Sequence, residues 1–166
     1  MKIFKNKLNL QKEISKDNCL SFVPTMGGLH KGHLSLIKKA KRYKCKICVS
    51  IFVNPTQFNK KNDFKNYPRN LKLDIKKLKK LQINYLYLPS YRDIFSFKPK
   101  NKIYEDKFSK QLCGKFRKGH FRGVLNVVNR FLEIVAPKYI FLGTKDFQQL
   151  ILIDNHIKKN KIKTKV

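Results

Sequence analysis

The residues best suited to chemistry in this chain are two histidines, His30 and His33, in a short segment that also contains three glycines. The apolar residues before this segment predict the end of a buried strand at 19–23, and those after it predict a helix over 33 to about 43. Unpaired backbone N–H groups and the helix dipole favour negative charge where a helix begins. Glycine also lets the backbone approach a ligand closely. The segment therefore predicts a nucleotide site. The three glycines are Gly27, Gly28 and Gly32.

Two other interpretations of the histidine pair stay open. Histidines at this spacing can hold a metal ion, but such a site needs further ligands and no other candidate lies nearby in the sequence. The pair could also be ordinary polar residues that cap a helix. An H-x-G-H pattern alone is not specific, and it is the strand–turn–helix context that favours phosphate binding.

Length and composition limit the class of protein. The chain has 166 residues, enough for one domain with a proper core and too few for two full domains. Apolar residues make up 42%, a share typical of folded globular proteins. No apolar run approaches the length of a membrane span, and the N-terminus lacks the apolar segment of a signal peptide. We therefore expect a cytoplasmic protein with no membrane partner.

The net charge of +29, from 39 basic and 10 acidic residues, suggests a nucleic-acid-binding protein. Two observations argue against a specific nucleic-acid partner. The lysines are spread over nearly every segment, and arginine, the usual reader of phosphates and base edges, is scarce. We therefore expect most lysines to lie on solvated faces. The arginines are Arg42, Arg69, Arg92, Arg117, Arg122 and Arg130.

Four cysteines invite a redox or zinc interpretation, because Cys45 and Cys48 have C-x-x-C spacing. The chain has no second pair of this kind, and Cys48 leads directly into an apolar run. We therefore predict that Cys19, Cys45, Cys48 and Cys113 are all free thiols, buried or half-buried, in a reducing compartment.

Short apolar strands alternate with helices along the chain. Residues 90–118 are rich in loops, and apolar residues recur at helical spacing from Arg122 until Pro137, which ends that helix. The alternation predicts an α/β fold, with a parallel sheet covered by helices on both faces. The expected helices cover 8–15, 33–43, 71–81, 122–136 and 146–159, and the expected strands cover 19–23, 47–53, 84–88 and 139–142, with another beginning at 162.

In such sheets ligands bind beyond the carboxyl ends of the strands, so the residues after each strand are site candidates. Three of these loops, 24–33, 54–58 and 143–149, are polar and should meet at one edge. Their histidines, glycines, amides and lysine suit the transfer of a nucleotidyl group to an acid. Such a transfer needs positioning and charge stabilisation more than covalent help from the protein.

Each of these loop residues also has an ordinary interpretation. Lys145 could be solvated, although a lysine in the first turn of a helix opposes the dipole and so favours an anionic partner. Asp146 could cap the following helix, and Gln57 could cap its own loop. Gln149 could face solvent.

Five segments in a fixed order make the chain resemble a known family. They are 24–33, 49–58, 67–69, 119–124 and 143–149, and together they extend over nearly the whole chain. This combination is similar to that of the pantothenate synthetases, also called pantoate–β-alanine ligases. Other H-x-G-H nucleotidyltransferases, which act on substrates such as phosphopantetheine or choline phosphate, have no reason to keep both the second and the fifth segment.

The resemblance implies a Rossmann-like fold of the H-x-G-H nucleotidyltransferase type and a homodimer. It implies that ATP, with Mg²⁺, activates pantoate to an enzyme-bound pantoyl adenylate and that pyrophosphate is released. The amine of β-alanine then attacks, which yields pantothenate and AMP.

By position in the matching motifs, the resemblance implies catalytic roles for His33 as proton donor, His30 as its partner on the phosphates, and Lys145 on phosphate. It implies that Gln57 contacts both pantoate and β-alanine and that Gln149 contacts pantoate. We expect no resident metal ligand. The implied ATP-binding residues are Met26, Gly27, Gly28, Leu29, His30, Lys31, Gly32, His33, Gly143, Thr144, Lys145 and Asp146.

The chain departs from the family pattern at several positions. Thr144 replaces a glutamate, and Lys118 stands where a proline is usual. Leu73 removes one member of an acidic pair ahead of Asp74. The motif around His120 lies near the site, but the residue types alone assign it no role.

The larger departure is at the end of the chain. Family members continue past the strand at 162 into a loop with a serine-serine-arginine motif that closes over the ATP phosphates, and then into a smaller C-terminal domain. We therefore expect residues 1–166 to form a single nucleotide-binding domain without that C-terminal lid. Two hypotheses follow: a ligase, or a catalytically impaired remnant that only binds ATP or pantoate or dimerises. The missing arginine would stabilise charge on the transferring phosphate.

Overall fold

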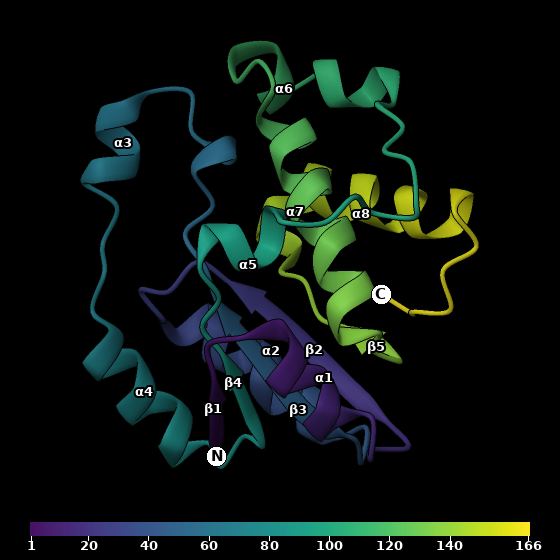
Figure 1. Ribbon diagram of the computed structural model, residues 1–166. Helices are drawn as coiled ribbons and strands as arrows, with labels where there is room; N and C mark the ends of the chain where they lie inside the picture. The colour runs from purple at the N-terminus through teal and green to yellow at the C-terminus, as the bar shows by residue number, and fades with distance from the viewer.

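Five parallel strands form one sheet at the centre of the computed structural model, which describes residues 1–166 (Figure 1). Their order across the sheet is β1-β4-β3-β2-β5, and every neighbouring pair is parallel. The predicted parallel α/β fold is therefore confirmed. The strands are β1 (Lys2–Phe4), β2 (Leu20–Thr25), β3 (Lys46–Ile51), β4 (Tyr85–Tyr87) and β5 (Tyr139–Ile140).

The sequence did not indicate β1, because this three-residue edge strand is mostly exposed and has no apolar run. The strand expected from 162 onward is present as a single parallel bridge between Tyr139 and Lys165. Strand β1 and the bridge at Lys165 lie at the two edges of the sheet, where few side chains are buried and the sequence therefore shows little apolar pattern.

The longer helices lie close to their predicted bounds: α1 (Lys7–Ile14), α2 (Lys31–Lys41), α4 (Leu71–Lys80), α7 (His120–Val135) and α8 (Phe147–Lys159). The segment 90–118, expected to be rich in loops, contains the short helices α5 (Tyr91–Phe95), η2 (Lys107–Lys110) and α6 (Cys113–Phe116). Between β3 and α4 lie η1 (Pro55–Gln57) and α3 (Lys61–Lys65), and a further turn, η3 (Thr144–Asp146), precedes α8. None of the helices combines the length and apolar character needed to cross a bilayer.

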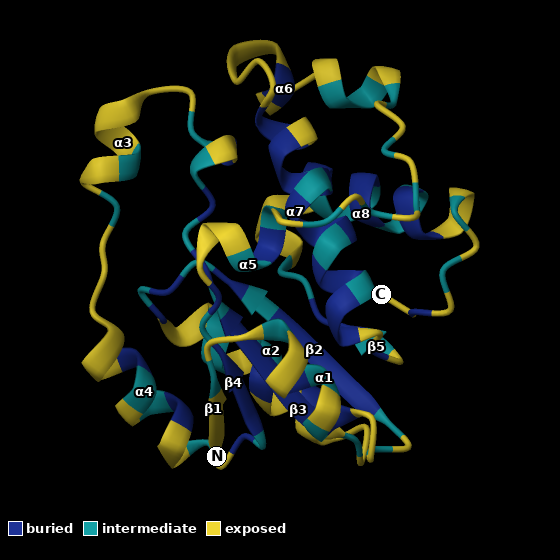
Figure 2. Ribbon diagram, viewed as in Figure 1, coloured by how far each residue is buried: buried dark blue, intermediate teal, exposed yellow.

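Two apolar clusters cover the two faces of the sheet. Successive residues of a strand point to opposite faces, so Phe22 joins the cluster with α1, α7 and α8, and Val23 joins the one with α2 and α4. Figure 2 shows the buried residues concentrated in β2, β3, β4 and α7. Helix α7 is buried on most of its circumference, as expected of a helix enclosed by other elements.

Pro24 lies within β2, where a proline has no N–H to pair. The carbonyls of Leu20 and Phe22 accept hydrogen bonds from the β5 side, and that of Thr25 accepts one from Phe52 after β3. Successive residues of a strand bond alternately to the strand on one side and the strand on the other. Leu20, Phe22 and Pro24 are alternate residues, so the nitrogen of Pro24 faces β5, as the other two residues do. Strand β5 ends at Ile140, so Pro24 lies beyond the last pair of residues that β2 and β5 share.

The prediction of four free thiols is wrong for one pair of cysteines. Cys19 and Cys45 form a disulfide, with their Cα atoms 4.9 Å apart. They precede the adjacent parallel strands β2 and β3, whose amino ends lie at the same edge of the sheet. Cys48 is free and buried, as expected, and burial raises the pKa of its thiol. Cys113 is free but exposed, which the sequence did not predict.

A buried histidine joins α7 to α8. The exposed fraction of His156 is 2%, and its Nε2 lies 3.1 Å from Asn129 Oδ1, while its Nδ1 lies 3.2 Å from Asn160 Nδ2. An amide oxygen accepts and an amide nitrogen donates, so His156 is neutral with its proton on Nε2. Burial lowers its pKa below the ordinary value of 6.5.

We predict that this histidine makes the protein less stable in acid. The unfolded chain binds a proton at the imidazole as the pH falls through 6.5, but the folded chain resists protonation, so the free energy of unfolding falls below that pH. His156→Gln keeps a donor for Asn129 but does not titrate. The slope of stability against pH should therefore decrease by up to about 1.4 kcal/mol per pH unit in the variant. Urea unfolding at a series of pH values measures the slope, and equal slopes in both proteins would contradict the prediction.

Candidate functional site

A cavity of about 450 Å³ lies at the carboxyl end of the sheet. It is bounded by the loops that follow β2, β3 and β5 and by one side of α7. Strands β2 and β5 are neighbours, but the loop after β2 leads into α2 on one face of the sheet and the loop after β5 leads into α8 on the other, so a crevice opens between the two loops. The predicted site residues on its wall are Met26, His30, Gly32, His33, Gln57, Gly143, Thr144, Lys145, Asp146 and Gln149.

The two histidines cap α2 and are oriented by its backbone. His30 Nδ1 accepts a hydrogen bond from Gly32 N at 3.1 Å, and His33 Nδ1 lies 3.5 Å from His30 N. The capping interpretation is therefore correct as a description of contacts. Capping does not prevent ligand binding. Each Nδ1 accepts a hydrogen bond from the backbone, so a neutral imidazole carries its proton on Nε2, and that N–H group remains able to bind a ligand. The ring centroids are 4.2 Å apart.

The electrostatic surroundings keep His33 uncharged. Burial lowers its pKa, and the neighbouring His30 lowers it further, against a smaller opposing effect of Asp74 and Asp146. The ring is therefore a neutral donor near pH 7, with its Nε2–H available to an acceptor such as a phosphate oxygen. This arrangement is suited to donating a hydrogen bond to an anion.

Four predicted ATP residues, Gly27, Gly28, Leu29 and Lys31, do not line the cavity. The two glycines have positive φ angles of 83° and 61°, which few other residues adopt, and a Cβ on Gly27 would lie 3.1 Å from Ile51. Their role in the structure is therefore to form the turn. Leu29 is buried in the core, and Lys31 is exposed.

Asp74 holds this turn from the neighbouring helix α4. Its carboxylate accepts hydrogen bonds from Gly28 N at 2.9 Å and from Leu29 N at 2.8 Å, and Lys77 Nζ donates to the Leu29 carbonyl. Those two N–H groups are therefore unavailable to a phosphate. The sequence did contain a signal: Asp74 occupies the buried face of a lysine-rich helix together with Leu78, where an acid needs a partner.

The loop after β3 presents Gln57 at the cavity with its orientation fixed. Asn54 is fully buried, and its Nδ2 donates to Gln57 Oε1 at 3.0 Å. The amide oxygen of Gln57 is engaged in this way, so its NH₂ group is the end free to donate to a ligand. The interpretation of Gln57 as a simple loop cap does not account for its place on the cavity wall.

The loop after β5 places one charge of each sign at the cavity. Lys145 and Asp146 are exposed, line the cavity and form no ion pair within the chain. Asp146 occupies the N-cap position of α8, as its ordinary interpretation predicts, but its side chain makes no capping hydrogen bond. Gln149 also lines the cavity, whereas its neighbour Gln148 is buried and bonds to the backbone of residues 108–113.

Apolar side chains from α7 form another wall of the cavity. Val124, Val127, Val128 and Phe131 recur at helical spacing, and the sequence therefore indicated only a core-facing side. Spacing cannot distinguish a core from a cavity wall, since both need the same apolar stripe. Tyr67 lines the cavity as well, and burial raises the pKa of its phenol.

The chain contains no cluster of three or more His, Cys, Asp or Glu side chains that could hold a metal ion. The metal interpretation of the histidine pair therefore has no support in the structure. Asp146 is the one carboxylate on the cavity wall.

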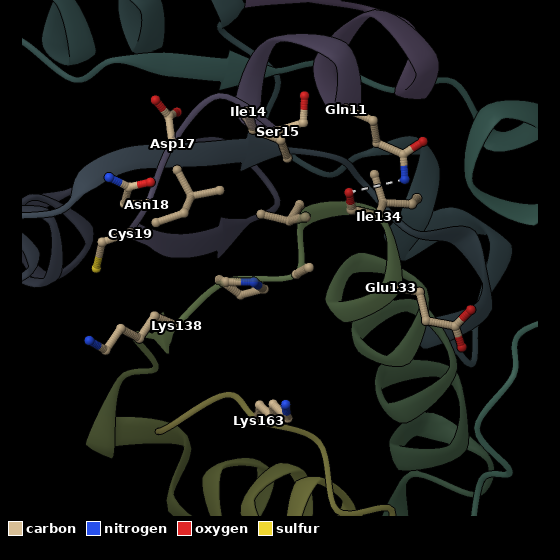
Figure 3. A pocket seen from close by; sticks show the side chains of 14 residues that line it. Gln11, Ile14, Ser15, Asp17, Asn18, Cys19, Glu133, Ile134, Lys138 and Lys163 are labelled. Atoms are coloured by element: carbon tan, nitrogen blue, oxygen red, sulfur yellow. Dashed lines mark hydrogen bonds between the residues drawn. The ribbon is translucent and has the colours of Figure 1, made fainter.

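A second cavity, of about 510 Å³, lies at the amino end of the sheet (Figure 3). Several of its polar side chains already have partners. Gln11 donates to the Ile134 carbonyl at 3.3 Å, and Asp17 pairs with Lys46 at 2.6 Å. None of the predicted site residues lines it, so the cavity at the carboxyl end is the candidate site.

The family model described as "Pantoate-beta-alanine ligase" matches residues 2–166 of the chain. The chain belongs to this family. A pantothenate synthetase of Flavobacterium psychrophilum is 44% identical over 162 residues, which cover 96% of this chain and 57% of that relative. One of Francisella philomiragia is 46% identical over 158 residues, which cover 95% and 60%. The chain thus spans about three fifths of the length of these relatives.

Solved structures of the family have the same fold. The pantoate-beta-alanine ligase of Francisella tularensis, crystallised with Beta-gamma ATP and beta-alanine, superposes with a TM-score of 0.93 at 42% identity, over 99% of this chain and 65% of that one. A pantothenate synthetase of Thermus thermophilus gives 0.93 at 31% identity, over 100% and 60%. The nucleotidyltransferase-like α/β fold of the ligase family is thereby confirmed for this chain.

We predict that Asp74→Ala destabilises this ligase-family domain by about 3 kcal/mol, because it removes two hydrogen bonds to a charged acceptor and leaves buried N–H groups unpaired. Asp63→Ala is the control, since Asp63 is exposed on α3 and its loss should change stability by less than about 0.5 kcal/mol. Urea unfolding monitored by circular dichroism measures both. A similar small change in the two variants would show that Asp74 does not hold the turn.

Proposed function

We propose that the chain binds ATP and pantoate in the cavity at the carboxyl end of the sheet and joins pantoate to β-alanine through a pantoyl adenylate. The observation that carries the proposal is that two histidines, a lysine and two glutamines line one cavity in a chain of the ligase family: His30, His33, Lys145, Gln57 and Gln149. We also propose that residues 1–166 act as a nucleotide-binding domain, in line with their match to three fifths of the relatives.

The first step transfers the adenylyl group to pantoate. A carboxylate oxygen of pantoate attacks the α-phosphorus, the bond from this phosphorus to the bridging oxygen breaks, and pyrophosphate leaves with the electron pair. His30 and His33 donate Nε2–H groups to phosphate oxygens, and the exposed ammonium of Lys145 adds positive charge. These groups stabilise the charge that develops on the phosphates, and the Nε2–H of His33 donates a hydrogen bond to the leaving oxygen.

Mg²⁺ fits this site as a companion of the nucleotide. A magnesium ion keeps several waters and usually takes only one or two protein carboxylates together with substrate phosphates. Asp146 is the carboxylate on the cavity wall that can take this place, since Asp74 is engaged with backbone N–H groups. The ion supplies neutralisation of phosphate charge when it is bound.

Pantoate carries a carboxylate, two hydroxyl groups and a carbon with two methyl groups, and the cavity has complementary parts. Gln57 donates its free NH₂ group to an oxygen of the substrate, and Gln149 offers a second amide. Val127 and Val128 provide an apolar surface for the methyl groups.

The second step consumes β-alanine. Its uncharged amine attacks the carbonyl carbon of the adenylate, the bond to the phosphate oxygen breaks, and AMP leaves while the nitrogen loses a proton. The amide of Gln57 contacts β-alanine as well as pantoate, because both must lie against the same carbonyl carbon.

We predict that the protein exchanges labelled pyrophosphate into ATP only when pantoate is present. His33→Ala should reduce this exchange by about 100-fold or more, because it removes a hydrogen-bond donor to the phosphates. His156→Gln changes a histidine remote from the cavity and should keep the exchange. Exchange without pantoate would refute the substrate assignment, and binding of both ligands without exchange would favour the impaired remnant.

We also predict that 2,4-dihydroxybutanoate, which lacks the two methyl groups, binds about fifteenfold more weakly than pantoate. Each methyl group buried against the valines contributes about 0.8 kcal/mol. Isothermal titration with each acid measures the difference. Equal affinities would show that the methyl groups do not contact the α7 wall.

A further inference from the structure

The motif at 119–124 has no role in the function proposed so far, although it begins the helix that forms the cavity wall. Helix α7 starts at His120 after Gly119, whose φ of 77° turns the chain sharply into the helix. The first turn of α7 packs against η1, which contains Gln57.

The imidazole of His120 is bonded to the backbone of Gln57. Its exposed fraction is 8%, and its Nδ1 lies 2.8 Å from the Gln57 carbonyl oxygen. A carbonyl can only accept, so Nδ1 carries the proton. His120 does not line the cavity, and it therefore acts on a ligand only through Gln57.

Gly123 allows the helix and the loop to approach closely. A Cβ at this position would lie 2.2 Å from Thr56 O and 2.7 Å from Thr56 C, and backbone atoms at such distances must move. The Gly123 carbonyl also accepts a hydrogen bond from Asn54 Nδ2 at 3.2 Å, and the same nitrogen donates to Gln57 Oε1 at 3.0 Å. The backbone and the side chain of Gln57 are thus both tied to the first turn of α7.

We propose that His120 and Gly123 are positioning residues that fix the Gln57 amide relative to the apolar wall of α7. This inference rests on the proposed function, because it specifies how that site recognises pantoate. Helix α7 then fixes the position of the Gln57 NH₂ donor and, through Val124 and Val127, also provides the apolar surface. The spacing between the two is fixed by one rigid element, so a substrate must match both at once.

The opposite side of the cavity is independent of this anchor. The phosphate-binding candidates lie on the loop after β2 and the loop after β5, and His120 hydrogen-bonds to neither. Changes at His120 should therefore weaken binding of pantoate and leave binding of ATP unaltered.

The test compares two replacements of His120 in the full chain. His120→Leu removes the donor, and His120→Asn places an amide nitrogen close to the position of Nδ1. In isothermal titration, His120→Leu should raise the Kd for pantoate about tenfold, and His120→Asn should restore it to within about threefold of the original. The Kd for ATP should stay within about twofold in both. Gly123→Ala should behave like His120→Leu.

The outcomes separate the inference from the function on which it rests. If the unaltered chain binds ATP but not pantoate, the proposed function fails. If it binds pantoate and His120→Leu binds equally well, or if His120→Asn gives no rescue, the positioning role fails. Equal weakening for ATP and pantoate would indicate a general structural role and would also overturn it.

A measurement on the unaltered chain covers the case in which the variants do not fold. Nitrogen-15 NMR of the imidazole distinguishes the two neutral tautomers, and His120 should carry its proton on Nδ1. His33, with an accepting Nδ1, should show the opposite tautomer and serves as the internal reference. A proton on Nε2 of His120 would exclude the bond to Gln57 and with it the proposal.

Discussion

The site depends on the parallel pairing of β2 with β3 on one side and β5 on the other. Because parallel strands end at the same edge of a sheet, three loops that are far apart in the sequence meet around one cavity. The side chains proposed to contact the ligands lie on these loops, and α7 forms the apolar wall. The two apolar clusters that hold the helices against the sheet are therefore also what keeps histidines, amides and charges together.

The parts of the structure predicted from sequence are those set by local patterns. Apolar runs located β2, β3, β4 and β5, and helical spacing located the buried side of α7. The parts that were missed depend on contacts between distant segments. The carboxylate of Asp74 meets the turn at Gly28, and Cys19 meets Cys45, only after the sheet has formed. Residue types at these positions indicate the need for a partner but do not identify it.

The candidate site shows the same division. The sequence identified the side chains that line the cavity on the loops after the strands, because their order relative to the strands is local information. It assigned Gly27 and Gly28 to the ligand, which stays a prediction; in the structure they form a turn in which Gly28 N and Leu29 N donate hydrogen bonds to Asp74. It also predicted that the α7 valines pack in the core, which is confirmed, but it did not indicate that they line the cavity as well. Proximity along the chain thus indicates which loops form the site, but not which atoms face it.

Pro24 has a consequence for the shape of the crevice. It lies on the cavity wall and directs a nitrogen without hydrogen toward the side where β5 has ended. A residue with an amide proton at this position could donate one more backbone hydrogen bond to the segment that follows β5. Pairing could then extend into the space between β2 and that segment. Because proline has no such proton, Pro24 adds no hydrogen bond toward β5 at the edge of the cavity, and the gap between the two strands stays free of pairing there.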